Sequence, residues 1–219
     1  MASGGMGGEM REYLFKIIIV GDLSTGKTSI IKRYVHDIFS MRCKATVGVD
    51  FALKTLVMED GQMVVRLQLW DIGGQERFQN TTRPYYKEAV GAFVVFDVTR
   101  GEALDGAAKW KQDIDTKVKL PDGKDIPVVL LGNKCDLAKE GTCKDNEEMV
   151  KYCKENGFVG WFKTSAKNNT GIEDAFNFLV KKILEAESTQ LLARRPTEGT
   201  VSLEDSNRGE GGRGGCCLS

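Results

Sequence analysis

The sequence lacks a surplus of either charge and lacks long apolar runs. Its 31 basic residues are matched by 31 acidic residues without a basic block, so nucleic acid is not expected as a partner. No apolar run approaches the roughly 20 residues that a membrane-spanning helix needs. Residues 1–10 are rich in glycine and have no apolar core, which argues against a signal peptide, and Ala2 excludes the N-myristoylation pattern.

Histidine is almost absent, and the cysteines show no metal-binding pattern. His36 is the only histidine, and no pair of cysteines has metal-ligand spacing with a histidine nearby. The cysteines are therefore expected to be thiols in a reducing compartment. They lie at positions 43, 135, 143, 153, 216 and 217.

What the sequence does contain is a glycine loop at Gly21–Thr28 with the pattern G-x-x-x-x-G-K-T. The apolar run Leu14–Val20 before it predicts a buried parallel strand, and a helix is predicted from Lys27 to His36. A glycine loop between a strand and a helix is typical of a phosphate-binding loop, because backbone N–H groups and the helix N-terminus attract an anion. An ordinary glycine-rich turn is the plainer alternative. The predicted phosphate-binding residues of this loop are Gly21, Ser24, Thr25, Gly26, Lys27, Thr28 and Ser29.

Side chains that would handle Mg²⁺ and water are predicted around this loop. Lys27 is expected to reach the β- and γ-phosphates, and Thr28 to ligate Mg²⁺. Asp71 follows a predicted strand and is expected to hold Mg²⁺ through water. The residues expected near the γ-phosphate are Thr46, which would also meet Mg²⁺, Gly74, through its N–H, and Gln75, which would orient the attacking water. For Thr46 alone, a loop threonine without a role is the plainer alternative.

A base-reading motif, N-K-C-D, occupies Asn133–Asp136 after another predicted strand. The Asp136 carboxylate only accepts hydrogen bonds, so it can take both N1–H and N2–H of guanine, whereas adenine would leave it unpaired. The Lys134 stem can lie over the base, and the backbone after the last strand can donate to guanine O6. A polar turn at a strand end, and a core role for Phe39, are the plainer alternatives. The predicted base-binding residues are Phe39, Asn133, Lys134, Asp136, Ser165, Ala166 and Lys167.

Apolar runs alternate with helical patterns along the chain. Strands are predicted at 14–20, 49–58, 63–71, 90–97, 127–133 and 161–165, with a hairpin turn at Asp60–Gly61. Helices are predicted at 27–36, 103–119, 146–156 and from a capping box at 170–173 to about residue 192. We expect a three-layer α/β fold whose six-stranded sheet is mostly parallel, with one antiparallel edge strand and about five helices.

The domain is expected to span residues 13–192, between a flexible N-terminus at 1–12 and a disordered tail at 193–219. Ligands of such sheets bind at the carboxyl ends of the strands, where all of these motifs fall.

These motifs together resemble the Rab family of small GTPases in the Ras superfamily, over about residues 13–185 and the terminal cysteines. The sequence motifs on which the resemblance rests are Gly21–Thr28, Ala45–Phe51, Trp70–Phe78, Tyr85–Tyr86, Asn133–Asp136 and Ser165–Lys167. Three segments have sequences similar to those of one subgroup, Rab thirty-two and its relatives: Ile30–His36, Tyr86–Phe96 and Gly160–Phe162.

The resemblance implies a P-loop GTPase fold and a Mg²⁺-dependent GTP/GDP switch in endosomal and lysosome-related membrane traffic. GTP would order the loops around Thr46 and Gln75 so that effectors bind, and hydrolysis would release them. Phe51, Trp70 and Tyr85 resemble the family's aromatic effector patch, although core packing is an equal alternative. The implied partners are an exchange factor, a GTPase-activating protein, effectors, a GDP-dissociation inhibitor and the prenylation machinery.

The chain ends in G-C-C-L-S at Gly215–Ser219. As a simple C-a-a-X box this would suggest one farnesyl group on Cys216. The resemblance implies instead geranylgeranyl chains on Cys216 and Cys217, and two chains are favoured because a single chain binds membranes only marginally. An incidental cysteine pair is the alternative.

Two residues depart from the family pattern. Leu23 stands where a small residue is common, and Gly73 stands where alanine is usual. Both predict slow intrinsic hydrolysis and keep open a second function, a GTP-locked membrane scaffold that recruits partners. A third alternative, an ATP-dependent small-molecule kinase, is disfavoured because Asp136 would face adenine unpaired.

Overall fold

The structure is a computed structural model that describes residues 10–41, 45–58, 61–74, 82–101, 103–138 and 145–193, with side chains up to residue 189. Within these residues, one six-stranded sheet has the strand order β2-β3-β1-β4-β5-β6. Strand β2 is antiparallel to β3, and all other neighbouring strands are parallel, as predicted. The strands are β1 (Arg11–Val20), β2 (Val49–Met58), β3 (Met63–Ile72), β4 (Gly91–Asp97), β5 (Val128–Asn133) and β6 (Gly160–Lys163).

Five α-helices and a short 3-10 helix lie in the described ranges, and they confirm the predicted α/β class. The four-residue helix α2 is too short for a helical period, and no helix is predicted there. Helix α5 begins at Ile172, one residue later than the predicted capping box requires. No described helix has the length and apolar content to cross a bilayer. The helices are α1 (Lys27–His36), α2 (Arg83–Tyr86), α3 (Ala103–Lys117), the 3-10 helix η3 (Cys135–Leu137), α4 (Asn146–Glu155) and α5 (Ile172–Ala193).

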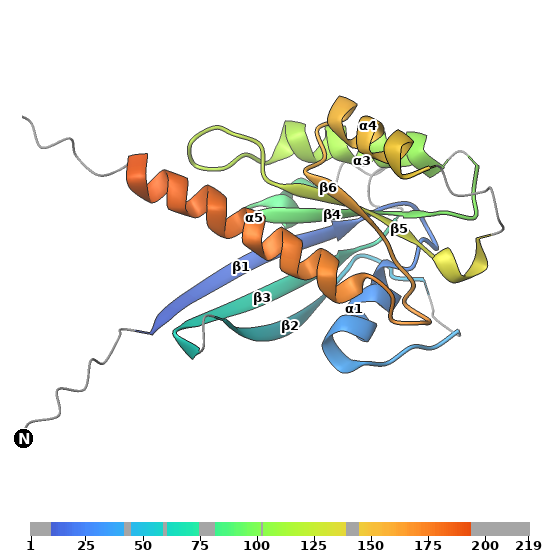
Figure 1. Ribbon diagram of the computed structural model, residues 1–219, viewed down its shortest axis with the longest axis horizontal. Coiled ribbons are helices and arrows are strands. Elements are labelled where there is room, and N and C mark those ends of the chain that lie inside the picture. Colours follow the sequence, from blue (N-terminus) through green and yellow to red (C-terminus); the bar gives the residue numbers. More distant parts are fainter. Residues whose placement is uncertain are drawn as a thin grey trace, which may run out of the picture.

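The helices cover the sheet from both sides (Figure 1). Strand β1 shows why, because its apolar residues alternate between two buried clusters. Ile17 and Ile19 pack in the cluster formed with α1 and α5, whereas Ile18 and Val20 pack in the cluster formed with α3 and α4. A continuous apolar strand of this kind needs cover on both faces, which produces the three-layer architecture.

The β2–β3 hairpin forms the antiparallel edge of the sheet. Its turn contains Gly61 with a φ of 90°, and the strands pair in register from Met58 opposite Met63 to Val49 opposite Ile72. Beyond the last pair, the backbone N–H of Gly73 donates to the carbonyl of Gly48 at 2.9 Å. The hairpin therefore stays closed where the segments that carry Thr46 and Gly74 leave the sheet.

The aromatic packing of α5 gives a test of the core. Phe176 is fully buried, and its ring centroid lies 3.8 Å from that of Tyr34 and 4.6 Å from that of Phe93. We expect Phe176→Ala to lower the free energy of unfolding by about 3–5 kcal/mol, because apolar contacts are lost and a cavity is left. The control Phe51→Ala, at a residue that is 67% exposed, should change it by less than about 0.5 kcal/mol. Urea unfolding under one fixed buffer compares the two variants, and equal losses would contradict the packing described.

Candidate functional site

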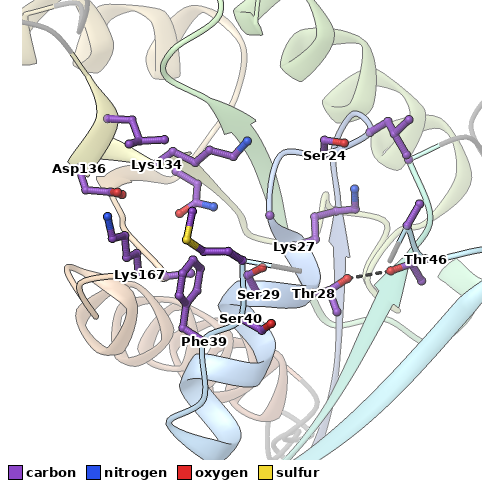
Figure 2. A pocket seen from close by; sticks show the side chains of 18 residues that line it. Ser24, Lys27, Thr28, Ser29, Phe39, Ser40, Thr46, Lys134, Asp136 and Lys167 are labelled. Carbon is purple, nitrogen blue, oxygen red and sulfur yellow. Dashed lines mark hydrogen bonds between the residues drawn. The ribbon is translucent and has the colours of Figure 1, made fainter. Parts of the chain in front are cut away.

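A cavity of about 550 Å³ lies where β1, β3, β5 and β6 end (Figure 2). This volume lies within the range typical of small-molecule sites. Segments far apart in the sequence meet around it, from the glycine loop at one end to Ala166 and Lys167 at the other. The predicted residues that line it are Ser24, Gly26, Lys27, Thr28, Ser29, Phe39, Thr46, Gly74, Asn133, Lys134, Asp136, Ala166 and Lys167.

The glycine loop presents a buried cation to this cavity. Gly26 is left-handed, with a φ of 95°, and α1 begins directly after it at Lys27. The Lys27 side chain is buried, and its Nζ donates to the backbone carbonyls of Gly21 at 2.8 Å and Asp22 at 3.0 Å. Burial lowers the pKa of Lys27 to about 8, and the carboxylates of Asp71 and Asp22 oppose this shift. The loop can therefore hold an anion at the start of α1.

Three side-chain oxygens gather at one side of the cavity. The hydroxyl oxygens of Thr28 and Thr46 lie 2.7 Å apart (Figure 2). Both hydroxyls donate to Oδ2 of Asp71, and the Thr46 bond is 3.2 Å long. Oδ1 of Asp71 is buried and has no hydrogen-bond partner among the described residues. Burial raises the pKa of the Asp71 carboxyl, although the hydrogen bond from Thr28 opposes the shift. Hard oxygens with one acceptor left unsatisfied fit a cation such as Mg²⁺.

The opposite side of the cavity carries an oriented carboxylate. The Ser165 hydroxyl donates to Oδ1 of Asp136 at 2.6 Å, and it accepts in turn from the backbone N–H of Asn168 at 3.0 Å. Strand β6 ends at Lys163, two residues earlier than predicted, so Ser165 lies in the turn after the strand. Figure 2 shows Asp136, Lys134, Lys167 and Phe39 around this side of the cavity. Phe39 lines the cavity and also packs against the cluster formed with α1 and α5, so its position is compatible with both predicted roles.

Asn133 joins the two sides. Its amide Nδ2 donates to the carbonyl of Thr25 at 2.8 Å, and the residue is only 2% exposed. A Cβ at Gly26 would overlap this amide, so glycine is needed there for space as well as for its left-handed backbone. The first residue of the N-K-C-D motif therefore contacts the glycine loop in addition to lining the cavity.

A sequence model of the Ras family matches residues 16–185. The chain belongs to the Ras family. It is 59% identical over 176 residues to Ras-related protein Rab-32 of Homo sapiens, which covers 80% of this chain and 77% of the relative. It is 58% identical over 198 residues to Ras-related protein Rab-32A of Dictyostelium discoideum, covering 90% and 89%. It is 46% identical over 189 residues to Ras-related protein Rab-7L1 of Homo sapiens, covering 86% and 91%.

These relatives confirm the resemblance inferred from the motifs. The chain is a Rab-like small GTPase of membrane traffic, and members of its family bind GTP and GDP and hydrolyse GTP. A hydrolysing switch is therefore favoured over a GTP-locked scaffold. The ATP-dependent kinase does not fit a family that binds guanine nucleotides.

Two residues of this Ras-family site lie outside the recognised sequence motifs and are not predicted from the sequence. Asp97 ends β4 and accepts from Lys134 Nζ at 2.7 Å. Burial would raise its pKa, but hydrogen bonds from Lys134 and Thr99 outweigh burial and lower it. Arg33 of α1 donates to the carbonyls of Ala166 at 2.8 Å and Lys167 at 3.2 Å. A polar residue at a strand end could have pointed to Asp97, whereas nothing local points to Arg33.

Two of the three predicted effector-patch residues lie together. Phe51 pairs with Trp70 across β2 and β3, with ring centroids 6.5 Å apart, and Lys16 Nζ lies 3.9 Å from the Trp70 ring centroid. Phe51 is 67% exposed, which contradicts a core role for it, whereas Trp70 and Tyr85 are partly buried and pack against the cluster formed with α3 and α4.

The remaining predicted site residues, Gln75, Cys216 and Cys217, lie outside the described residues.

The Asn133 bond gives a test of how the two sides are joined. We expect Asn133→Ala to lower the free energy of unfolding by about 1–3 kcal/mol, because the Thr25 carbonyl loses its buried donor. The control Thr116→Ala removes an exposed helix hydrogen bond to the Gln112 carbonyl and should cost less than about 0.5 kcal/mol. Urea unfolding at constant GDP concentration measures both, and a loss as small as that of the control would show that this bond does not hold the loops together.

Proposed function

We propose that GTP and GDP occupy the cavity with the phosphates on the glycine loop and guanine at Asp136. The observation that carries this proposal is that one cavity collects a buried ammonium at Lys27 and an oriented carboxylate at Asp136. The phosphates replace the loop carbonyls as partners of Lys27, and N–H groups of Gly21–Ser29 support them. Guanine lies against Phe39 and Lys134.

Mg²⁺ is held by Thr28, Thr46 and Asp71. The support for this assignment is that all three oxygens already meet and that Oδ1 of Asp71 lacks a partner among the described residues. When bound, the ion neutralises charge on the β- and γ-phosphates. Thr46 comes from the first loop and already contacts Thr28 and Asp71, and the γ-phosphate and Mg²⁺ would hold this loop in place.

Hydrolysis depends on Gln75, which orients the attacking water, and on the Gly74 N–H, which faces the γ-phosphate. It is slow without an activating protein. Leu23 lines the cavity, and a Cβ at Gly74 would overlap the Leu23 backbone, so the leucine lies directly beside the residue whose N–H faces the γ-phosphate. Gly73 adds roughly 0.5–1 kcal/mol to the entropic cost of ordering the second loop.

GTP orders the two loops and creates the surface that effectors bind, with Phe51, Trp70 and Tyr85 as its aromatic patch. An exchange factor and a GTPase-activating protein set the rates of the cycle, and a GDP-dissociation inhibitor accompanies the prenylated protein in the cytosol. The prenylation machinery modifies Cys216 and Cys217, which hold the protein on the cytosolic face of endosomal and lysosome-related membranes.

The expected domain of residues 13–192 is too short, because β1 begins at Arg11, which pairs with Met63, and α5 ends at Ala193. Residues 11 and 12 therefore belong to the sheet rather than to a flexible N-terminus, and residues 11–193 form the GTPase domain in this proposal, with the prenylated tail after it.

Base selection can be tested at Asp136. Asp136→Asn replaces one carboxylate oxygen by an N–H₂ donor. The remaining oxygen still accepts from N1–H, but the N–H₂ group opposes the guanine N2–H and suits the C2 carbonyl of xanthine. We expect affinity for GDP to fall by at least about 100-fold and affinity for xanthosine diphosphate to rise. Fluorescent-nucleotide competition measures both affinities. The control Asp145→Asn changes the exposed N-cap of α4 and should keep the preference for GDP. An unchanged preference in Asp136→Asn would remove this residue from the base site.

Hydrolysis can be tested with single-turnover phosphate release from protein loaded with GTP and Mg²⁺. We expect Gln75→Leu to slow release by roughly 100-fold or more, because the attacking water is no longer oriented. The matched control Gln112→Leu, on the exposed face of α3, should leave the rate unchanged.

The wild-type rate also separates the two functions weighed from the sequence. Tight GTP binding with no turnover would support the scaffold. If Leu23→Ser and Gly73→Ala both leave the wild-type rate unchanged, these residues are not the cause of slow hydrolysis.

A further inference from the structure

The second residue of the glycine loop, Asp22, has a side chain that no part of the proposed function uses. Its neighbours Leu23 and Ser24 line the cavity, whereas Asp22 is not among the lining residues. The Asp22 carboxylate lies against α3 instead, where the indole N–H of Trp110 donates to Oδ1 at 2.8 Å. A negative charge in a loop that binds phosphates is unfavourable unless it is directed away from them.

Helix α3 provides both a donor and a space for this carboxylate. Trp110 is fully buried in the cluster formed with α3 and α4, so its packing fixes the direction of its N–H. Gly106 lies one turn earlier, and a Cβ built there would overlap Oδ2 of Asp22. The two α3 residues thus act on the two oxygens of one carboxylate.

The backbone of Asp22 faces the opposite way, toward the cation of the site. Its carbonyl accepts from Lys27 Nζ at 3.0 Å and from the Thr25 hydroxyl at 3.0 Å. Carboxylate and ammonium therefore belong to one short loop and are separated only by the direction of the Asp22 side chain. A carboxylate released from α3 would be attracted to the poorly solvated Lys27 ammonium, because opposite charges interact strongly at low dielectric.

We infer that Trp110 and Gly106 are positioning residues of the phosphate site: they hold the Asp22 carboxylate on α3 and so keep the Lys27 ammonium available to the nucleotide phosphates. This inference rests on the proposed function in one respect, the assignment of Lys27 to the phosphates. It adds that α3, which lines no part of the cavity, determines how firmly the loop holds its nucleotide.

A purely structural role for these residues would have a different signature. If the Trp110 bond only stabilised the fold, its loss would lower stability, and removing the Asp22 charge would not restore nucleotide binding. If the bond keeps the carboxylate from Lys27, neutralising Asp22 must repair the damage, because asparagine cannot form an ion pair. The repair of one substitution by a second is therefore the deciding observation.

Gly106→Ala is the sharpest variant. Alanine is a better helix former than glycine, and the atom that its Cβ would overlap is the end of a flexible side chain, so the fold is retained while the carboxylate is displaced. We expect fluorescent GDP to dissociate about tenfold faster from Gly106→Ala, with a melting temperature equal to or above that of the wild type. Trp110→Phe, which removes the donor, should show the same faster release.

The second substitution is Asp22→Asn, made alone and with Gly106→Ala in the full-length protein. Alone it should stay within about threefold of the wild-type rate, since Oδ1 still accepts from Trp110. Combined with Gly106→Ala it should bring the rate back to within about threefold of wild type. The control Tyr152→Phe removes another partly buried α3 contact, the 2.7 Å bond to the Leu104 carbonyl, and should leave GDP release unchanged.

A wild-type rate in Gly106→Ala, or a double variant as fast as Gly106→Ala alone, would overturn the inference. An equal acceleration in Tyr152→Phe would also overturn it, since any loosening of α3 would then suffice. Failure of the proposed function has a different result: the wild-type protein would not bind GDP, or Lys27→Met would bind it as tightly as the wild type.

Discussion

The burial of one ammonium group is the constraint on which the site depends. A poorly solvated Lys27 needs oxygen partners, and the loop supplies two from its own backbone, the carbonyls of Gly21 and Asp22. The left-handed Gly26 lets the chain close around the side chain directly before α1 begins. In the proposed function, a phosphate that enters the site would meet a cation already in place and would replace its carbonyl contacts, so the lysine would not have to be ordered on binding.

Around that cation, the parallel sheet brings residues from distant parts of the chain to one edge. Asn133 links the base side to the glycine loop, and Arg33 links α1 to the loop after β6 through the carbonyls of Ala166 and Lys167. A movement of the base side of the cavity would therefore be transmitted to the glycine loop through these few hydrogen bonds. A nucleotide that spans both sides, as proposed, would therefore stabilise the whole edge at once.

The sequence predicts what depends on local patterns and not what depends on distant partners. Apolar runs and a glycine motif predict the bounds of α1 and the six-stranded sheet. Short sequence motifs at the ends of strands predict the residues around the cavity. Arg33 escapes prediction because its partner Ala166 lies 133 positions away, and Asp97 because Lys134 lies 37 positions away. The short helix α2 escapes as well, since four residues show no period. Phe51 needs the structure for another reason, because alternation along an edge strand does not say which face is covered.

The hydrogen bond between Gly73 and Gly48 closes the open end of the β2–β3 hairpin. The segment that leads back to Thr46 and the segment that leads on to Gly74 thus start from one shared backbone contact, fixed to ten residue pairs of antiparallel sheet. In the proposed function, a protein that pulled either segment away from the nucleotide would strain this contact and loosen the other segment too. Under that proposal, a regulator would need to touch only one of the two loops to act on both.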